Sequence, residues 1–165
     1  MRIQTVQRSD WREYQQIRLA ALKESPSAFA STWQEEALLA PSQWKERAQR
    51  SQDGQTQTIV AAVDEAGRWV GLAGGYRPGD READAELISM WVVPECRGRR
   101  IGPQLVRAVV AWATGHEAST IGLWVNKANQ PAISLYEKEG FRRTGEVDKL
   151  RSDPTQQEIR MLRAS

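Results

Sequence analysis

The sequence predicts an α/β fold: a single domain with a mixed, mostly antiparallel twisted sheet flanked by helices. Three observations predict it. Helical periodicity fills most of the first third of the chain, strand patterns follow from residue 58, and strands and helices then alternate before a final strand pair. At 165 residues and 18.6 kDa the chain has the size of one domain with its own core, so we expect one domain over residues 1–165.

The N-terminal part is predicted to begin with a strand and continue as helices. Residues 3–6 have strand character, and Asp10 is expected to cap a helix that ends near Lys23. One face of this helix carries the apolar residues Tyr14, Ile17, Ala21 and Leu22. Ser25-Pro26 ends it, because a residue before proline disfavours the helical conformation. Further helices are expected over 32–39 and 41–51.

The remaining elements follow a strand-rich order. Strand patterns cover 58–63, 69–76 and 86–93, with turns at 64–67 and Pro78-Gly79-Asp80. The third strand is apolar on both faces, which is typical of a central, covered strand. We then expect a helix over 101–113, a strand over 121–125, and a helix over 131–139 that Gly140 ends. Residues 141–147 and 158–162 are predicted to form a closing antiparallel pair, joined by a loop that contains Asp153-Pro154.

Composition and charge exclude several function classes. A formal net charge of +2 gives little support for nucleic-acid binding, and no apolar run reaches the length of a membrane span. The first residues lack a signal-peptide core. One cysteine, Cys96, cannot form an internal disulfide and fits a reducing cytoplasm, where we expect the protein. One cysteine and one histidine, His116, argue against a zinc site, so no metal is expected.

The most informative segment runs from Val92 to Gly102. An apolar strand meets Pro94, a basic loop follows, and an amphipathic helix begins at Ile101. Helix N-termini and guanidinium groups both bind phosphate, so the segment predicts a phosphate or pyrophosphate site. The alternative is an arginine-rich surface turn. A dinucleotide fold and a P-loop are excluded, because neither Gly-x-Gly-x-x-Gly nor Gly-Lys-Ser/Thr occurs here.

Two segments together resemble the signatures of the GNAT superfamily of N-acetyltransferases. In the first, Arg97 and Gly102 fill the ends of the family's Arg/Gln-x-x-Gly-x-Gly/Ala pattern, whereas Arg100 stands at its middle Gly. In the second, residues 129–141 carry Asn, Ala, Leu-Tyr and Gly-Phe at the family's intervals. An L-residue avoids positive φ, so we expect Arg100 to have ordinary helical or bridge torsions and to direct its charge at a phosphate.

The resemblance implies direct acetyl transfer from acetyl-CoA to a primary amine of a small molecule, peptide or protein. It also implies that the strand ending at Val93 separates from the strand over 121–125, leaving backbone groups at 91–93 for the pantetheine arm and an N–H near Val92 for the thioester oxygen. A homodimer is compatible with it. The residues implied in coenzyme binding are Trp91, Val92, Val93, Arg97, Gly98, Arg99, Arg100, Ile101, Gly102, Asn129 and Tyr136.

Two residues are candidates for proton transfer. Tyr136 stands where the family often places its general acid, and a phenol is protonated at neutral pH; the alternative is a core tyrosine. Glu86 lies on the apolar strand before the basic loop, where desolvation would make a carboxylate a better base. The alternatives are a strand-end Glu that faces solvent or pairs with an Arg, with a water chain taking the amine's proton.

The sequence also allows other interpretations of the function and of several residues. A non-catalytic acyl-CoA-binding domain could use the same fold, because fold does not determine function. A nucleic-acid binder is disfavoured by the near-neutral charge, despite the arginines at 97, 99, 100, 142 and 143. Glu35 and Glu36 could attract a cationic amine or simply face solvent, and Trp33, Trp44 and Trp91 could line the acceptor site or pack in the core. No motif specifies the acceptor.

Overall fold

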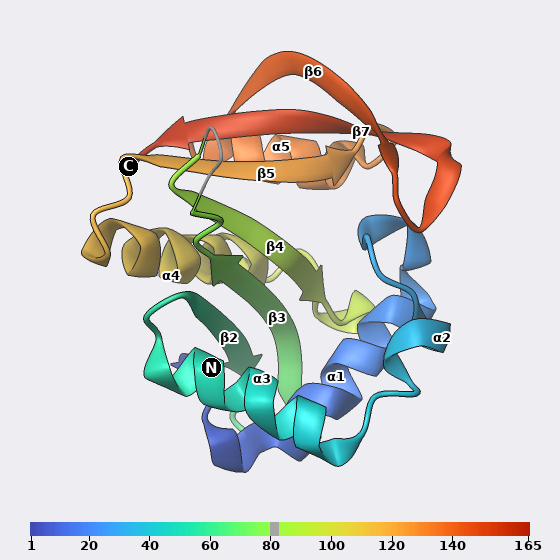
Figure 1. Ribbon diagram of the computed structural model, residues 1–165, viewed down its shortest axis with the longest axis vertical. Coiled ribbons are helices and arrows are strands. Elements are labelled where there is room, and N and C mark those ends of the chain that lie inside the picture. The colour runs from blue at the N-terminus through green and yellow to red at the C-terminus, as the bar shows by residue number, and fades with distance from the viewer. Residues whose placement is uncertain (80–82) are drawn as a thin grey trace.

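A single seven-stranded sheet organises the structure, in the order β1-β2-β3-β4-β5-β7-β6 (Figure 1). The computed structural model describes residues 1–79 and 83–165. Neighbouring strands are antiparallel except β4 and β5, which confirms the predicted fold class. The strands are β1 (Arg2–Thr5), β2 (Gln57–Val63), β3 (Trp69–Tyr76), β4 (Ala85–Val92), β5 (Thr120–Asn126), β6 (Arg142–Leu150) and β7 (Asp153–Ala164). The helices are α1 (Trp11–Glu24), α2 (Trp33–Glu36), α3 (Pro41–Asp53), α4 (Ile101–Gly115) and α5 (Gln130–Lys138), with 3-10 turns η1 (Arg8–Asp10), η2 (Pro26–Ala28) and η3 (Pro94–Cys96).

Helices cover both faces of the sheet and create two cores. In β2, Ile59 and Ala61 point to the core under α1 and α3, whereas Val60 and Ala62 point to the core under α4 and α5. This alternation follows from the two-residue period of a strand. Trp44 of α3 is fully buried in the first core, as are most of the apolar residues predicted for α1.

The structure differs from three local predictions, although α1 begins directly after Asp10 as expected. The Asp10 carboxylate accepts the Gln7 N–H at 2.9 Å, so it closes η1 and makes no side-chain cap on α1. The helix expected over 32–39 is the single turn α2. Asp153 and Pro154 begin β7 and do not lie in a loop, because β6 and β7 are joined at residues 151–152. Of the turn predicted at Pro78-Gly79-Asp80, Asp80 lies outside the described residues.

The parallel contact between β4 and β5 is short. Only Ala85 with Ile121 and Glu86 with Gly122 are paired, and beyond them the two strands separate (Figure 1). The separation expected from the resemblance is therefore present. β4 also bulges: Ile88 pairs with Gly74 and Trp91 with Leu72, which leaves two residues of β4 opposite one residue of β3.

A buried ion pair lies where β4 and β5 are still paired. Both Glu86 oxygens accept from Arg160 of β7, at 2.7 Å from Nη1 and 2.6 Å from Nη2, and both side chains are almost fully buried. Gly122 lies between them on β5. A Cβ atom built on Gly122 would stand 2.4 Å from Arg160 Nη2, so the absence of a side chain there creates the space for the guanidinium.

Replacing this glycine should displace the guanidinium. Gly122→Ala is expected to destabilise the fold by about 3 kcal/mol, because a buried pair that loses its geometry leaves an uncompensated charge. Urea unfolding measures the effect. Gly115→Ala is the matched control: Gly115 ends α4, and nothing lies within 4 Å of an added Cβ. Equal stabilities of the two variants would contradict the role given to Gly122.

Candidate active site

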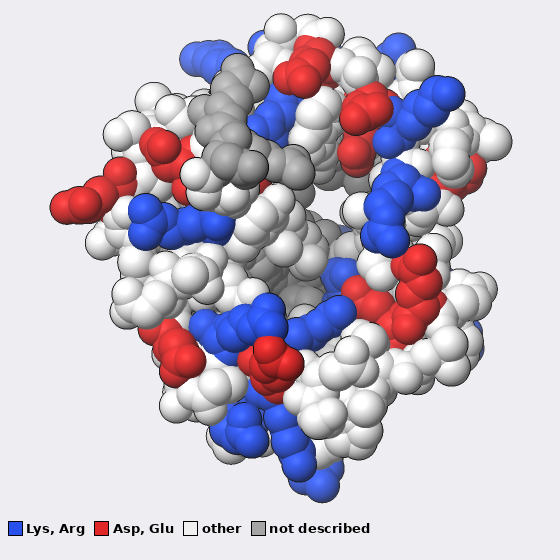
Figure 2. Space-filling model, in the orientation of Figure 1, with Lys and Arg blue, Asp and Glu red and all other residues white. Residues whose placement is uncertain are grey.

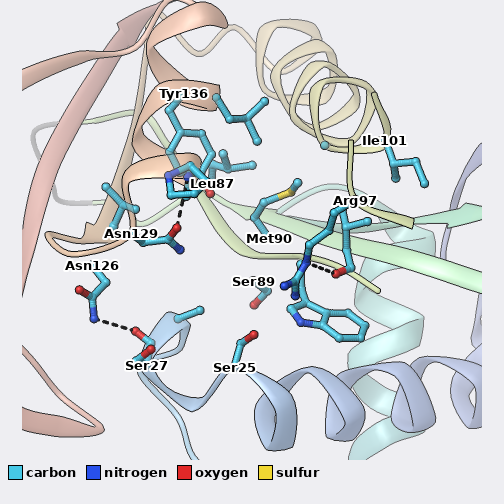
Figure 3. Close-up of a pocket in the computed structure, with 18 of the residues that line it drawn as sticks. Ser25, Ser27, Leu87, Ser89, Met90, Arg97, Ile101, Asn126, Asn129 and Tyr136 are labelled. Atoms are coloured by element: carbon cyan, nitrogen blue, oxygen red, sulfur yellow. Dashed lines mark hydrogen bonds between the residues drawn. The ribbon is translucent and has the colours of Figure 1, made fainter. Parts of the chain in front are cut away.

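A cleft of about 800 Å³ opens where β4 and β5 separate. Its walls come from β4, β5, the end of α1 with the following turn, the loop before α4, and α5. Figure 2 shows this face of the molecule hollowed near its centre, and Figure 3 shows the side chains around the cleft. One cleft thus joins the two sequence segments that carried the family resemblance.

Most of the predicted coenzyme-binding residues line this cleft, and three predicted site residues do not. Val93, Arg99 and Glu86 are not part of its wall. The lining residues among those predicted are Trp91, Val92, Arg97, Gly98, Arg100, Ile101, Gly102, Asn129 and Tyr136. At Gly102, an added Cβ would stand 3.1 Å from Leu135 and 3.2 Å from Met90, so the helix start packs closely against β4 and α5.

Arg100 precedes α4 in the left-handed conformation, with φ 60° and ψ 23°. The expectation of helical or bridge torsions was wrong. The chain must turn sharply to start α4 here, and it adopts the conformation that glycine takes readily even though an arginine occupies the position. The strain costs roughly 1–2 kcal/mol in an L-residue. The Ile101 and Gly102 N–H groups lie in the first turn of α4, where a helix offers them no internal acceptor.

Three backbone groups of this segment are already bonded, and two of them lie in the range 91–93 that was expected to be free for the pantetheine arm. The Val93 N–H donates to the Val70 carbonyl at 3.0 Å, so Val93 belongs to the β3 side of β4. The Arg97 N–H donates to the Pro94 carbonyl at 3.2 Å. The Val92 carbonyl accepts from Arg97 Nε at 3.0 Å (Figure 3). Because a strand residue points its N–H and C=O to the same side, the Val92 N–H faces the cleft side of β4.

Glu24, at the end of α1, is a cleft residue that the sequence analysis did not identify. Its Oε2 accepts from Arg97 Nη2 and from Trp91 Nε1, both at 2.9 Å. Partial burial alone would raise the pKa of Glu24, but hydrogen bonds from Ser25, Trp91 and Arg97 outweigh it, so the pKa lies below its usual value. Arg97 is thus held beside the loop by a carboxylate.

Helix α5 brings Asn129 and Tyr136 to the opposite wall. The Asn129 side chain accepts the Ala132 N–H at 3.2 Å and so caps the start of α5. Tyr136 is 7% exposed, lines the cleft, and packs edge-on against Phe141 with ring centroids 5.9 Å apart. Burial raises the pKa of its phenol well above the ordinary value of 10, so the hydroxyl keeps its proton at neutral pH.

Glu86 has the surroundings of a structural residue. Its carboxylate is held on both oxygens by Arg160 and is absent from the cleft wall. The geometry therefore matches the alternative in which this Glu pairs with an Arg. A general base needs a carboxylate oxygen that can reach the substrate, and both Glu86 oxygens are occupied by Arg160.

Helices α1 to α3 contain a second buried ion network. Arg18 donates to Glu36 through Nε at 3.0 Å and Nη2 at 2.8 Å, and Arg47 Nη1 donates to the same carboxylate at 3.1 Å. Glu36 is therefore neither solvated nor at the cleft. Burial alone would raise the pKa of Glu36, but the hydrogen bond and charge of Arg18 and the charge of Arg47 lower it overall.

The remaining candidates are distributed around the fold. Glu35 is exposed and accepts the Thr32 N–H, Trp33 is largely exposed, and Trp44 is a core residue, so only Trp91 of the three tryptophans lines the cleft. Cys96 is buried and lines the cleft.

The other end of the cleft is built from hydroxyl and amide groups. Asn126 Nδ2 donates to the Ser27 carbonyl at 3.1 Å (Figure 3). It also donates to Gln156 Oε1 at 2.7 Å, and Gln156 Nε2 donates to Asp153 at 2.8 Å. These bonds tie β5 to η2 and β7. Ser25, Ser27 and Ser89 complete this polar wall.

Within 1–79 and 83–165, no helix is both long and apolar enough to cross a bilayer. The same residues contain no group of three or more His, Cys, Asp or Glu side chains that could hold a metal ion.

Comparison with known proteins assigns the family. The family model described as the acetyltransferase (GNAT) family matches residues 10–141, which include both signature segments and the cleft walls between them. The chain belongs to the GNAT acetyltransferase family. The part of the family pattern that this member lacks, the middle glycine of the loop, coincides with the strained Arg100.

Individual GNAT relatives are distant. The chain is 30% identical over 90 residues to the mycothiol acetyltransferase of Arthrobacter sp. (strain FB24), which covers 52% of this chain and 27% of that protein. It spans less than half of the length of the curated relatives it matches, from 22% to 49%.

Solved structures share the fold over nearly the whole chain. A ribosomal-protein-alanine N-acetyltransferase from Brucella melitensis is 21% identical with a TM-score of 0.78, covering 100% of both chains. A phosphinothricin acetyltransferase from Sinorhizobium meliloti, solved in complex with AcCoA, is 20% identical with a TM-score of 0.79, covering 99% of this chain and 87% of that one.

The strain at Arg100 can be measured with a pair of variants. Arg100→Gly and Arg100→Ala both remove the guanidinium, but only glycine adopts a φ of 60° without strain. Arg100→Gly should therefore be more stable than Arg100→Ala by about 1 kcal/mol. Urea unfolding of the two variants side by side tests this; a more stable alanine variant would mean that the loop relaxes out of the left-handed conformation.

Proposed function

We propose that this protein is an N-acetyltransferase that transfers the acetyl group of acetyl-CoA directly to a primary amine of a small molecule, peptide or protein. The observation that carries the proposal is the separation of β4 from β5 beside the N-terminus of α4, with Tyr136 in the resulting cleft. Family membership and the AcCoA complex of a structural neighbour support it.

The loop and helix start provide the donor site. The N–H groups of Ile101 and Gly102 and the positive end of α4 suit a pyrophosphate, and the adjacent Arg100 adds a guanidinium charge. Arg97 also lines the cleft, but its guanidinium is bonded to the Val92 carbonyl and to Glu24. The cleft-facing N–H of Val92 is suited to the thioester oxygen, where negative charge develops as the amine attacks. Transfer forms the amide C–N bond, breaks the thioester C–S bond, and releases the coenzyme thiol.

Tyr136 is suited to protonate the departing thiolate. A thiol has an ordinary pKa near 8.5 and a tyrosine phenol one near 10, so transfer of the phenol proton to the thiolate is uphill. It completes the release only if the resulting phenolate is reprotonated. The cleft opens to solvent, which can return this proton. For the amine, we assign proton loss to water in the cleft, because the Glu86 carboxylate is engaged by Arg160.

Removing the Tyr136 hydroxyl should separate binding from turnover. In Tyr136→Phe, calorimetry should find the affinity for acetyl-CoA within about twofold of the unmodified protein, while kcat for thiol release falls about a hundredfold. Phe preserves the ring that packs against Phe141. An unchanged kcat would remove Tyr136 from the reaction. Failure of the unmodified protein to bind acetyl-CoA would overturn the proposal itself, and binding without thiol release from any amine would favour an acyl-CoA-binding domain.

The pH dependence of the rate tests whether Glu86 acts as a base. In Glu86→Gln, the limb of the kcat/KM profile that reports deprotonation of the base should keep its position, although the fold becomes less stable because Arg160 loses its counter-charge. Rates are measured well below the unfolding temperature of the variant. Loss of that limb with the fold intact would return the base role to Glu86.

A further inference from the structure

Ser89 has an unusual backbone at the point where the cleft begins. It lies in the β4 bulge, lines the cleft, and has φ 58°, a conformation that costs an L-residue roughly 1–2 kcal/mol. Strained residues of this kind persist where the surrounding structure holds them, and they concentrate at functional sites.

The hydroxyl of Ser89 is held from behind by Arg18. Arg18 Nη1 donates to Ser89 Oγ at 2.9 Å. A guanidinium has donors and no acceptor, so the serine oxygen must accept and its own proton must point elsewhere. In the part of the chain that the structure describes, no hydrogen bond from this hydroxyl to a protein acceptor is formed, and the side chain borders the cleft (Figure 3). The proton is therefore available to a bound molecule.

Arg18 is itself fixed. It is 7% exposed, bonded on two nitrogens to Glu36, and stacked 4.9 Å above the Phe29 ring. Because Glu36 also accepts from Arg47, the three side chains together carry one positive charge. This charge lies behind Ser89 and makes its hydroxyl a stronger donor and a weaker acceptor.

The described wall of the cleft has no free carboxylate that could bind an ammonium group besides the reacting amine. Among the described residues, Glu24 is the only acidic side chain in the wall, and it is bonded to Arg97 and Trp91. The other charged side chains of the wall are Arg97 and Arg100. A polyamine would bring, besides its reacting amine, a second ammonium group to a site that has no uncommitted carboxylate in its described wall.

We infer that the acceptor is an α-amino carbonyl compound, an amino acid or a peptide N-terminus, whose carbonyl or carboxylate oxygen accepts the Ser89 hydroxyl while its amine faces the thioester. The inference rests on the proposed function and narrows it. The α-amine of a peptide N-terminus has an ordinary pKa near 7.8, so about one molecule in three is neutral at pH 7.5, against about one in a thousand for a lysine amine. The amine of a free amino acid is more basic than that of a peptide, because its own carboxylate stabilises the ammonium form. The less basic amine of a peptide suits a cleft in which Glu86 is not available as a base.

The test is a thiol-release panel with acetyl-CoA, with rates expressed per concentration of neutral amine. Alanine amide, free alanine and an alanine-initiated tripeptide share the α-amino carbonyl group, and their relative rates distinguish a free amino acid from a peptide. Propylamine, spermidine and Nα-acetyl-lysine amide have amines without a neighbouring oxygen. The best α-amino carbonyl compound should exceed each of these at least tenfold in kcat/KM.

Ser89 variants provide the second readout. Ser89→Ala should raise KM for the preferred α-amino acceptor about three- to tenfold, as expected for one lost hydrogen bond, and leave the constants for propylamine unchanged. Ser89→Gly also removes the hydroxyl but relieves the strained φ, so it should show the same KM change with no loss of stability. Ser42→Ala, an exposed serine at the start of α3, is the control.

The failures are distinguishable. No acetyl-CoA binding and no thiol release with any amine would overturn the proposed function. Acetyl-CoA binding with propylamine, spermidine or the lysine derivative used as well as the α-amino compounds would overturn only the acceptor class. The acceptor class would also be overturned if acetyl-CoA bound and no α-amino compound were acetylated. It would be overturned as well if Ser89→Ala raised KM for propylamine and for the α-amino acceptor equally.

Discussion

The site depends on the early separation of β4 from β5. A parallel pair that continued beyond Glu86 and Gly122 would satisfy the backbone of β4 and fill the cleft with sheet. Because the strands part instead, β5 does not pair with the cleft side of β4 beyond Glu86, and a side chain, water or a ligand must satisfy the backbone groups there, as Arg97 does for the Val92 carbonyl. The helices on both faces, and the buried pair at the closed end, stabilise a sheet that is split in this way.

The two ends of the cleft differ in chemistry because different elements build them. One end combines the start of α4 with Arg97 and Arg100, and Glu24 of α1 restrains Arg97. The other end combines Ser27, Asn126 and Gln156, whose bonds connect η2, β5 and β7. The N-terminal helices thus do more than cover the sheet, since they contribute groups to both ends.

Much of the fold was predictable because periodicity is a local property. The positions of β3 and α4, and the cap at Asn129, follow from spacing and from single residue types. The torsions of Arg100 and Ser89 were not predictable in the same way, because they follow from how the chain must turn or bulge, and neither residue type favours a positive φ.

The ion pairs are a different case. Glu86 and Arg160 are 74 residues apart, and nothing in either segment identifies the other as its partner. Arg18 did carry a signal: it stands four residues after Tyr14 and four before Leu22, on the apolar face of α1, where a charge needs a buried counter-charge. Its partner, Glu36, lies on the single helical turn α2, for which the sequence predicted a longer helix.

The space that Gly122 leaves for Arg160 has an evolutionary consequence. Loss of the Glu86 carboxylate leaves a buried cation without a counter-charge, and loss of Arg160 leaves a buried carboxylate without one. A methyl group added at Gly122 disturbs both partners of the pair. A single substitution of this kind leaves either an unpaired buried charge or a steric clash. We therefore expect these three residues to change together, if they change at all.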